Sequence, residues 1–273
     1  VEMLARKSGA HVILMRVVPF LWPSEHVHLK EMGHKMDKEA SDYLFTVETH
    51  LVEKGIEASV FVDEGNVPEV ICDTAKEKGV DLIAISTHGH GGVKRWALGS
   101  VTSKVIQASS VPLLVHRSTG AQVAETYCKN VLIPIDGSQF AENIFSQARM
   151  IVELFNARVW FISVITVPGG FSVLEKEVLT IEDKVAESIK HYYSALENRF
   201  QEEQAINYEV VIRKGDPAET ICDFAEENNI DLIAMSTHGR GGISRWALGS
   251  VTDKVLHCSP KPILLVRAEE KKT

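Results

Sequence analysis

Short apolar runs alternate with amphipathic stretches along most of this chain. In the second half, residues 131–135 form an apolar run typical of a buried parallel strand. Residues 138–155 carry apolar side chains at helical spacing, and residues 158–165 form a second apolar run. Because crossover connections are right-handed, this alternation predicts an α/β domain with a doubly wound, five-stranded parallel sheet.

The rest of the second half continues the same alternation. The spacing predicts a long helix over residues 181–204 and a sheet-edge strand over residues 207–212. Asp216 is expected to cap a helix that has Pro217 at its first position. Three further elements are predicted: a strand at residues 231–235, a helix at residues 250–258 and a strand at residues 262–266.

The pattern occurs twice. The segment DLIAISTHGHGGVKRWALGSVTSKV, which begins at Asp81, is nearly repeated as DLIAMSTHGRGGISRWALGSVTDKV from Asp231. Duplication accounts for this similarity, so the sequence predicts two domains of one fold, residues 1–117 and 128–273. The polar residues 118–127 between them are interpreted as a linker.

The two copies differ at their starts. The second copy opens with KNVLIPIDGS from Lys129, whereas the first begins at Val1, already in the tail of the matching helix. A strand, a turn and half a helix therefore have no counterpart in the first copy. We interpret the sequence as truncated at its N-terminus and expect the first domain to lack its first strand.

Composition and charge limit the classes of function that the chain could have. The chain is 45% hydrophobic and 24% charged, as in soluble globular proteins, and no apolar run reaches the roughly 20 residues of a membrane span. A net charge of -8 argues against nucleic-acid binding, which needs a basic face. Without a signal-peptide pattern, a cytoplasmic location is expected, and all four cysteines are expected to be buried thiols: Cys72, Cys128, Cys222 and Cys258.

The candidate site lies where the first and fourth strands of the second copy end. Open α/β sheets bind ligands at such carboxyl ends, at the point where the strand order reverses. Residues 134–136 follow the first strand, and residues 235–239 lead from the fourth into a glycine-rich loop. That loop ends in Gly249 before a helix with Ser250 as its expected N-cap, so backbone amides there would face an anion.

These residues resemble the universal stress protein family in its tandem form. ATP-binding members carry G-x2-G-x9-G-[ST], which Gly239, Gly249 and Ser250 match, while Ser236 stands at the first glycine of the pattern. The resemblance implies that Asp136 lies beside the adenine–ribose end of a nucleotide. It also implies adenine contacts from the second strand and phosphate contacts from the start of the last helix.

The predicted nucleotide contacts can be given for both copies. In the second copy they are Pro134, Ile135, Asp136, Val164, Met235, Ser236, Gly239, Arg240, Gly242, Gly249, Ser250, Val251 and Thr252. In the first copy they are Val17, Ser86, Gly89, Gly99, Ser100, Val101 and Thr102. The first copy has no counterpart of Asp136, so its site is expected to be incomplete.

The leading hypothesis is a regulatory or stress-response protein that binds ATP, ADP or AMP, with Mg²⁺ as a candidate companion ion, and is not a dedicated enzyme. Two alternatives remain open: an interaction module without nucleotide, favoured by Ser86 and Ser236, and a weak ATP hydrolase. The sequence has no Walker lysine. A true enzyme of the adenine-nucleotide α-hydrolase type would need a Ser-Gly-Gly-rich loop after the first strand, which IDGSQF does not supply.

Neither a catalytic residue nor a metal site is predicted, because His88 and His238 have no identifiable nucleophile beside them. The last strands of the copies, residues 112–116 and 262–266, would be sheet edges. We predict that they pair within the chain as a pseudo-dimer. Association of two chains into a homodimer is left open.

Overall fold

The computed structural model describes residues 1–19, 27–87, 98–117, 128–166, 187–188, 192–193, 207–237 and 248–267, with residues 19 and 27–37 as backbone only. The chain forms two compact units, Val1–Ile83 with Ser100–Val111 and Ala84–Gly99 with Pro112–Thr273. The predicted linker and most of the long helix predicted over residues 181–204 lie outside the described residues.

The first unit combines helices with a two-stranded parallel sheet. Its elements are α1 (Glu2–Ser8), β1 (Val12–Pro19), α2 (Val27–Glu53), β2 (Ala58–Gly65), α3 (Val67–Glu77) and α4 (Ser100–Ala108). β1 pairs with β2, and the register sets Val12 opposite Ala58. Ala5, Leu51 and Ile56 are buried together, so this unit has a small apolar core of its own.

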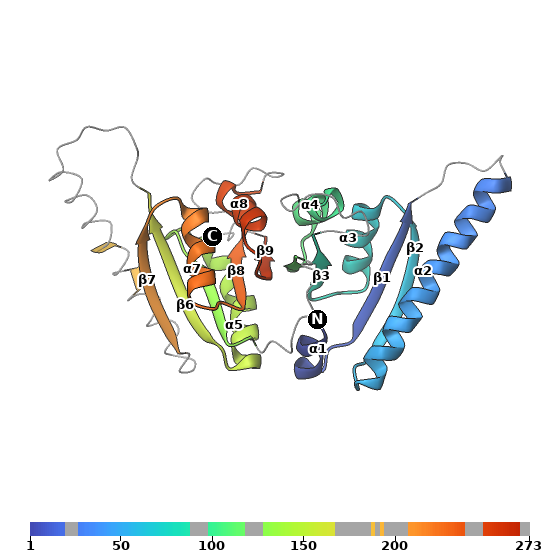
Figure 1. Ribbon diagram of the computed structural model, residues 1–273, viewed down its shortest axis with the longest axis horizontal. Helices are drawn as coiled ribbons and strands as arrows, with labels where there is room; N and C mark the ends of the chain where they lie inside the picture. Colours follow the sequence, from blue (N-terminus) through green and yellow to red (C-terminus); the bar gives the residue numbers. More distant parts are fainter. Residues whose placement is uncertain are drawn as a thin grey trace. The chain divides into compact units, whose positions relative to one another are not determined.

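The second unit is built around a seven-stranded sheet (Figure 1). Its elements are β3 (Ile83–Ser86), β4 (Leu113–His116), β5 (Asn130–Pro134), η1 (Ala141–Ile144), α5 (Phe145–Phe155), β6 (Arg158–Ile165), β7 (Tyr208–Lys214), α7 (Pro217–Glu227), β8 (Leu232–Ser236), α8 (Ser250–Cys258) and β9 (Ile263–Val266). The strand order is β3-β4-β9-β8-β5-β6-β7.

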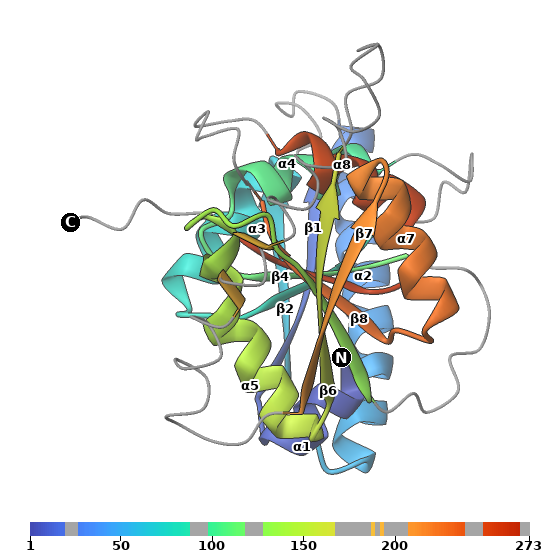
Figure 2. The same ribbon diagram turned by 90° about the vertical axis from the view of Figure 1, so that its left-hand side faces the viewer.

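The second copy has the doubly wound sheet expected of it. Its five strands lie in the order β9-β8-β5-β6-β7, and every neighbouring pair is parallel. α7 and α8 lie side by side on one face and α5 covers the other (Figures 1 and 2), as right-handed crossovers require. The carboxyl ends of β5 and β8 therefore lie next to each other.

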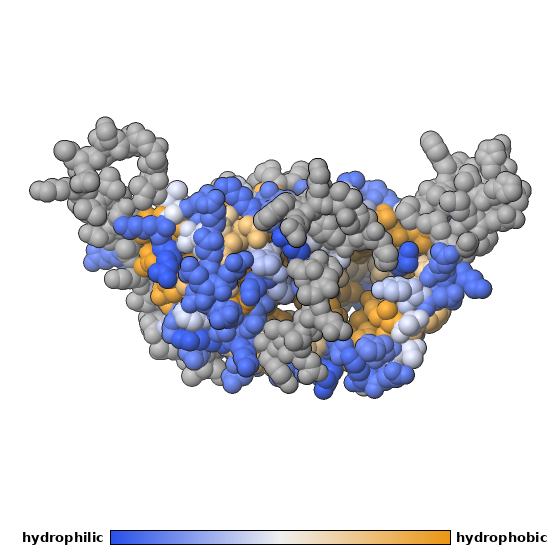
Figure 3. Space-filling view, viewed as in Figure 1, coloured by the Kyte–Doolittle hydropathy of each residue, from blue (hydrophilic) through white to orange (hydrophobic). Residues whose placement is uncertain are grey.

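Burial explains why these segments take their places. Every residue of β8 and β9 is buried, as expected of strands covered on both faces. α7 buries Ile221 and Phe224 and exposes Glu219 and Glu226, so its outer side is hydrophilic in Figure 3. Within the described part of the chain, no helix is both long and apolar enough to span a bilayer.

The strands of the first copy are divided between two sheets. β1 and β2 form a separate pair, whereas β3 and β4 join the sheet of the second unit. In the second copy, β5 pairs with both β6 and β8 and so connects the corresponding strands. The first copy has no counterpart of β5 in this sequence, which accounts for the division.

The strand pairing predicted between the two copies is present. β4 runs antiparallel to β9, with Leu113 opposite Leu265 and Leu114 opposite Leu264. Leu264 and Leu265 are 2% and 1% exposed. An apolar edge that would otherwise be free to associate is thus covered within the chain.

The helix expected from Ser138 begins later. A turn of 3-10 helix starts at Ala141, and the α-helix runs from Phe145 to Phe155. Oδ1 of Asp136 accepts hydrogen bonds from the backbone amide of Ser138 at 2.9 Å and from its hydroxyl at 2.6 Å. Together with the positive φ of 79° at Gly137, these bonds form a tight turn in place of the first helical turn.

The expectation of four free thiols is wrong. Cys222 of α7 and Cys258 of α8 form a disulfide, with their Cα atoms 6.4 Å apart. Cys72 and Cys128 are free and half-buried. Burial, and secondarily the charge of Asp231, raises the pKa of Cys128 to about 12, so this thiol stays protonated and unreactive at neutral pH.

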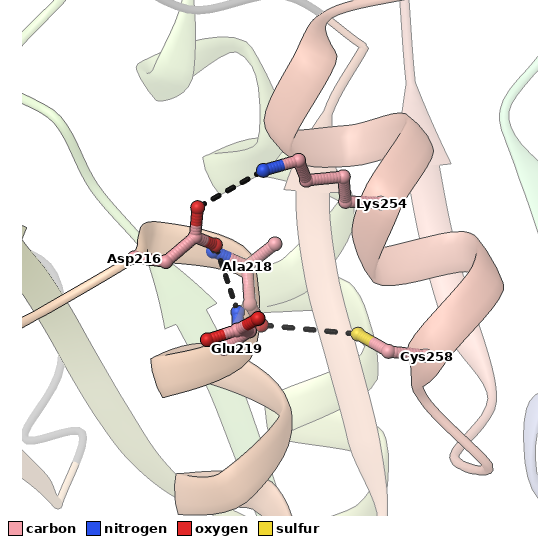
Figure 4. A network of polar contacts seen from close by, with 5 residues as sticks. All are labelled: Asp216, Ala218, Glu219, Lys254 and Cys258. Carbon is pink, nitrogen blue, oxygen red and sulfur yellow. Dashed lines mark hydrogen bonds and ion pairs between the residues drawn. The ribbon is translucent and has the colours of Figure 1, made fainter.

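Asp216 caps α7 as predicted (Figure 4). One carboxylate oxygen accepts from the amides of Ala218 and Glu219 at 3.0 and 3.2 Å, and the other lies 2.9 Å from Nζ of Lys254 in α8. The Lys254 ammonium group, followed by the Glu219 amide, lowers the pKa of Asp216. In the first copy, Asn66 makes no side-chain cap bond to α3.

We expect Asp216→Ala to lower the free energy of unfolding by about 1 kcal/mol, and Asp216→Asn, which keeps a capping oxygen, to lower it by less. Because folding lowers the pKa of Asp216, its charge stabilises the fold above the ordinary aspartate pKa. This contribution is lost as the pH falls through the lower folded value. Urea unfolding should therefore separate wild type from Asp216→Asn at neutral pH and not in acid.

The matched control is Asn66→Ala, which removes no cap bond and should change stability by less than about 0.5 kcal/mol. Equal losses from Asn66→Ala and Asp216→Ala would contradict the capping role of Asp216.

Candidate functional site

The candidate site lies where β5 and β8 end, at the reversal of strand order. Val131 lies opposite Leu232, and Leu132 opposite Ile233, in a parallel register. Both strands therefore run toward the same edge of the sheet and end side by side. This register brings the segment after β5, which contains Asp136, next to the segment after β8.

The start of α8 projects its backbone amides at this edge. The N-cap is Gly249, not Ser250 as the sequence indicated, and among the described residues no side chain caps the helix. The first helical hydrogen bond runs from the amide of Asp253 to the carbonyl oxygen of Gly249 at 2.9 Å. The amides of Ser250 and Val251 precede that bond, and the helix dipole adds positive potential there.

The start of α8 is fixed to the end of β8 by hydrogen bonds. Oγ1 of Thr252 donates to the carbonyl oxygen of Ser236 at 3.0 Å, and both residues are buried. The amide of Gly249 donates to the carbonyl oxygen of Thr237 at 2.8 Å. The two ends of the intervening loop are thereby joined, so the first turn of α8 has a defined position at the sheet edge.

The end of β6 extends beyond β5. The pairing of β6 with β5 stops at Ile162, whereas its pairing with β7 continues through Val164 to Ile165. Val164 is half-buried and lies opposite Arg213. On the side where β5 has ended, this last part of β6 borders the same edge as Asp136.

Two buried hydroxyl groups, those of Ser163 and Tyr193, support this edge from the protein interior. This pair was not predicted from the sequence. Oγ of Ser163 donates to the carbonyl oxygen of Ile135 at 2.7 Å and lies 2.9 Å from the hydroxyl of Tyr193. Burial raises the pKa of Tyr193 to about 12, against a smaller opposing effect of its bond to Ser163. A serine within the apolar run RVWFISVI was the available signal.

A second tyrosine, Tyr192, lies close to the carboxylates at this edge. The hydroxyl of Tyr192 donates to Oε1 of Glu142 at 2.8 Å. Burial raises the pKa of Tyr192 first, and the carboxylates of Glu142 and Asp136 raise it further. Tyr192 therefore lies within the field of two carboxylates at the Asp136 end of the site.

The described site residues of the second copy come from three strand ends and one helix. They are Pro134, Ile135, Asp136, Val164, Met235, Ser236, Gly249, Ser250, Val251 and Thr252. The predicted residues Gly239, Arg240 and Gly242 lie outside the described part of the chain, as do His238 and, in the first copy, His88 and Gly89.

The first copy reproduces only part of this arrangement. The amide of Gly99 donates to the carbonyl oxygen of Thr87 at 3.0 Å, which repeats the Gly249–Thr237 bond. Ser86, however, is exposed, whereas its counterpart Ser236 is 6% exposed. The other predicted residues of this copy, Val17, Ser100, Val101 and Thr102, belong to the first unit.

Comparison with known proteins gives one consistent family. Residues 1–117 and 128–267 each match the model of the universal stress protein family. A universal stress protein of Mycobacterium tuberculosis is 28% identical over 195 residues, which cover 68% of this chain and 62% of that protein. The aligned part thus spans less than two thirds of that relative. A universal stress protein of Methanocaldococcus jannaschii is 28% identical over 155 residues, 54% of this chain and 86% of its own length.

The fold is similar to that of a solved universal stress protein from Archaeoglobus fulgidus. The TM-score is 0.69 at 22% identity, over 97% of this chain and 91% of that chain. The likeness extends over nearly the whole chain and therefore includes both copies.

We expect Thr252→Val to lower the free energy of unfolding by about 1–3 kcal/mol, because it leaves the buried carbonyl oxygen of Ser236 without this donor. Thr252→Ser keeps the hydroxyl and should lose less. Urea unfolding of both variants checks this, and a loss from Thr252→Ser as large as that from Thr252→Val would contradict a dominant role for the hydrogen bond.

Proposed function

Because the chain belongs to the universal stress protein family, we propose that its second copy binds an adenine nucleotide as a regulatory ligand. ATP, ADP and AMP share the adenine, ribose and phosphate groups that this site would contact. The observation that carries the proposal is the start of α8, which presents the amides of Ser250 and Val251 at the strand-order reversal.

The phosphates would lie against the first turn of α8. A hydrogen bond between a backbone amide and a charged phosphate oxygen contributes on the order of 1.5–3 kcal/mol. Several such bonds, with the helix dipole, would offset the long-range repulsion from a chain of net charge -8. Gly239, Arg240 and Gly242 are proposed to contact the ribose and phosphates, and Mg²⁺ is proposed to accompany a polyphosphate.

The adenosine would lie toward β5 and β6. The carboxylate of Asp136 is held by Ser138 at the end of β5 and is only half-buried, so a ribose hydroxyl could donate to it. The end of β6 at Val164, which continues past β5, would supply backbone contacts to the adenine. The Ser163–Tyr193 pair would support this end from the interior.

A role in regulation or the stress response, in the cytoplasm, fits these features better than a role as a dedicated enzyme. The sequence carries no Walker lysine to assist phosphoryl transfer. Slow ATP hydrolysis is compatible with the proposal. Steady-state turnover faster than about one per second, within the usual enzyme range, would contradict it.

The first copy favours a second function, that of an interaction module without nucleotide. Its β3 is half-buried to exposed where β8 is fully buried, and Ser86 at the end of β3 is exposed. We propose that nucleotide binds to the second copy alone, with one equivalent per chain.

We expect Gly249→Val to weaken ATP binding at least tenfold, because its side chain would occupy the space in which phosphate approaches the first turn of α8. Gly249 has a φ of -59°, which valine adopts readily, so the fold should be retained. Equilibrium dialysis with ATP measures the effect, and mass spectrometry of denatured protein identifies any nucleotide that co-purifies.

The matched control is Gly99→Val at the equivalent position of the first copy, which should leave the affinity unchanged. Unchanged affinity in Gly249→Val would place the phosphates elsewhere. Wild-type protein that neither carries nor accepts an adenine nucleotide would refute the proposal.

A further inference from the structure

α7 and α8 are joined at two places besides their apolar contacts, and Figure 4 shows the first of them, the Asp216–Lys254 pair. Asp216 at the start of α7 pairs with Lys254, and Cys222 is covalently bound to Cys258 at the end of α8. The disulfide connects cysteines that lie 36 residues apart in sequence, one in each helix. Its position makes it a link between α7 and the helix whose first turn forms the candidate phosphate site.

The fold itself does not require this link. In the first copy, α3 and α4 also pack against each other, but Ala108 stands at the position that Cys258 has in the sequence repeat. Cys72 is accordingly a free thiol. One of two homologous helix pairs is therefore cross-linked, which indicates a purpose other than folding.

The disulfide is open to attack from one side. Cys222 is 7% exposed, whereas Cys258 is half-buried at the last residue of α8. An incoming thiolate would therefore reach the sulfur of Cys258 first. Once the bond is broken, Val255 and Leu256 would still be buried against the domain core, so the helix pair should remain folded.

α8 is held at its two ends by different bonds. Thr252 fixes its first turn to β8 through the carbonyl oxygen of Ser236, and Cys258 fixes its last residue to α7. A helix of nine residues is about 13 Å long, so a change at one end is transmitted to the other as a tilt. If the disulfide were opened, the last residue of α8 could move, and the amides of Ser250 and Val251 would be less precisely oriented.

We propose that Cys222 and Cys258 form a reversible thiol–disulfide site whose closed form orders the start of α8 and raises its affinity for anionic ligands. The reductant that would open this disulfide is a dithiol. Its thiolate attacks Sγ of Cys258, the Cys222–Cys258 bond breaks, and Cys222 leaves as a thiolate that takes up a proton. The second thiol of the reductant then displaces Cys258, so the protein gains two electrons and two protons and the dithiol becomes a disulfide.

The first test concerns the site and needs no nucleotide. Alkylation of the unreduced, full-length chain during brief denaturation, which makes the half-buried thiols accessible, should label only Cys72 and Cys128. Dithiothreitol added to the folded protein should expose Cys222 and Cys258 to alkylation, identified by peptide mass. Four reactive thiols in untreated protein, or a bond that opens only in denaturant, would overturn the proposal.

The second test concerns the order of α8. Hydrogen exchange of a peptide covering residues 248–258, which includes the bonded amides of Gly249 and Asp253, should become at least tenfold faster on reduction. Residues 98–108 of the first copy, which carry no cross-link, should not change. Cys258→Ala should exchange like reduced wild type under both conditions, and Cys72→Ala should keep the full response.

The third test measures ATP affinity and rests on the proposed function. ATP should bind about three- to tenfold more weakly to reduced protein and to Cys258→Ala, because their α8 is less ordered before binding. Equal affinity and equal exchange in both redox states would overturn this inference and leave the nucleotide site intact. Absence of ATP binding in both states would instead refute the proposed function, and the exchange experiment alone would then decide the present inference.

Discussion

The hydrogen bond from Thr252 to the carbonyl oxygen of Ser236 fixes the start of α8 at the end of β8, and the candidate site depends on this position. It attaches the first turn of α8 to the end of β8 inside the protein, since both residues are buried. The direction of the α8 dipole therefore depends on the sheet and not on the loop that connects the two elements. Because β8 pairs with β5, the same bond also fixes α8 relative to the turn that holds Asp136.

The two copies show what the central strand contributes. β5 pairs with β6 and β8 and supplies Asp136 at its end, so it joins the sheet and completes the candidate site together. Without a counterpart of β5, β1 and β2 form their own sheet, and Ser86 is exposed where Ser236 is buried. The glycine-to-helix connection survives in both copies, because the bonds from Gly99 and Gly249 need only β3 or β8.

Features determined by neighbours in sequence were predictable, and features determined by tertiary packing were not. The apolar runs gave the strands, and Asp216 followed by Pro217 gave a helix start, since both signals are local. The disulfide depends on α7 and α8 lying side by side, a relation that the spacing of cysteines does not encode. The Ser163–Tyr193 pair likewise joins residues from separate elements. The delayed start of α5 follows from the competing turn at Asp136.

Charge gives the candidate site a direction. At one end lie the carboxylates of Asp136 and Glu142, which add to the effect of burial on the pKa of Tyr192, so this end carries negative charge. At the other end, the start of α8 carries the positive end of a helix dipole. A nucleotide has the complementary polarity, with hydroxyl donors on its ribose and negative charge on its phosphates. The proposed orientation, with ribose at Asp136 and phosphates at α8, is the one that keeps like charges apart. The same separation explains how an acidic chain of net charge -8 could hold an anionic ligand.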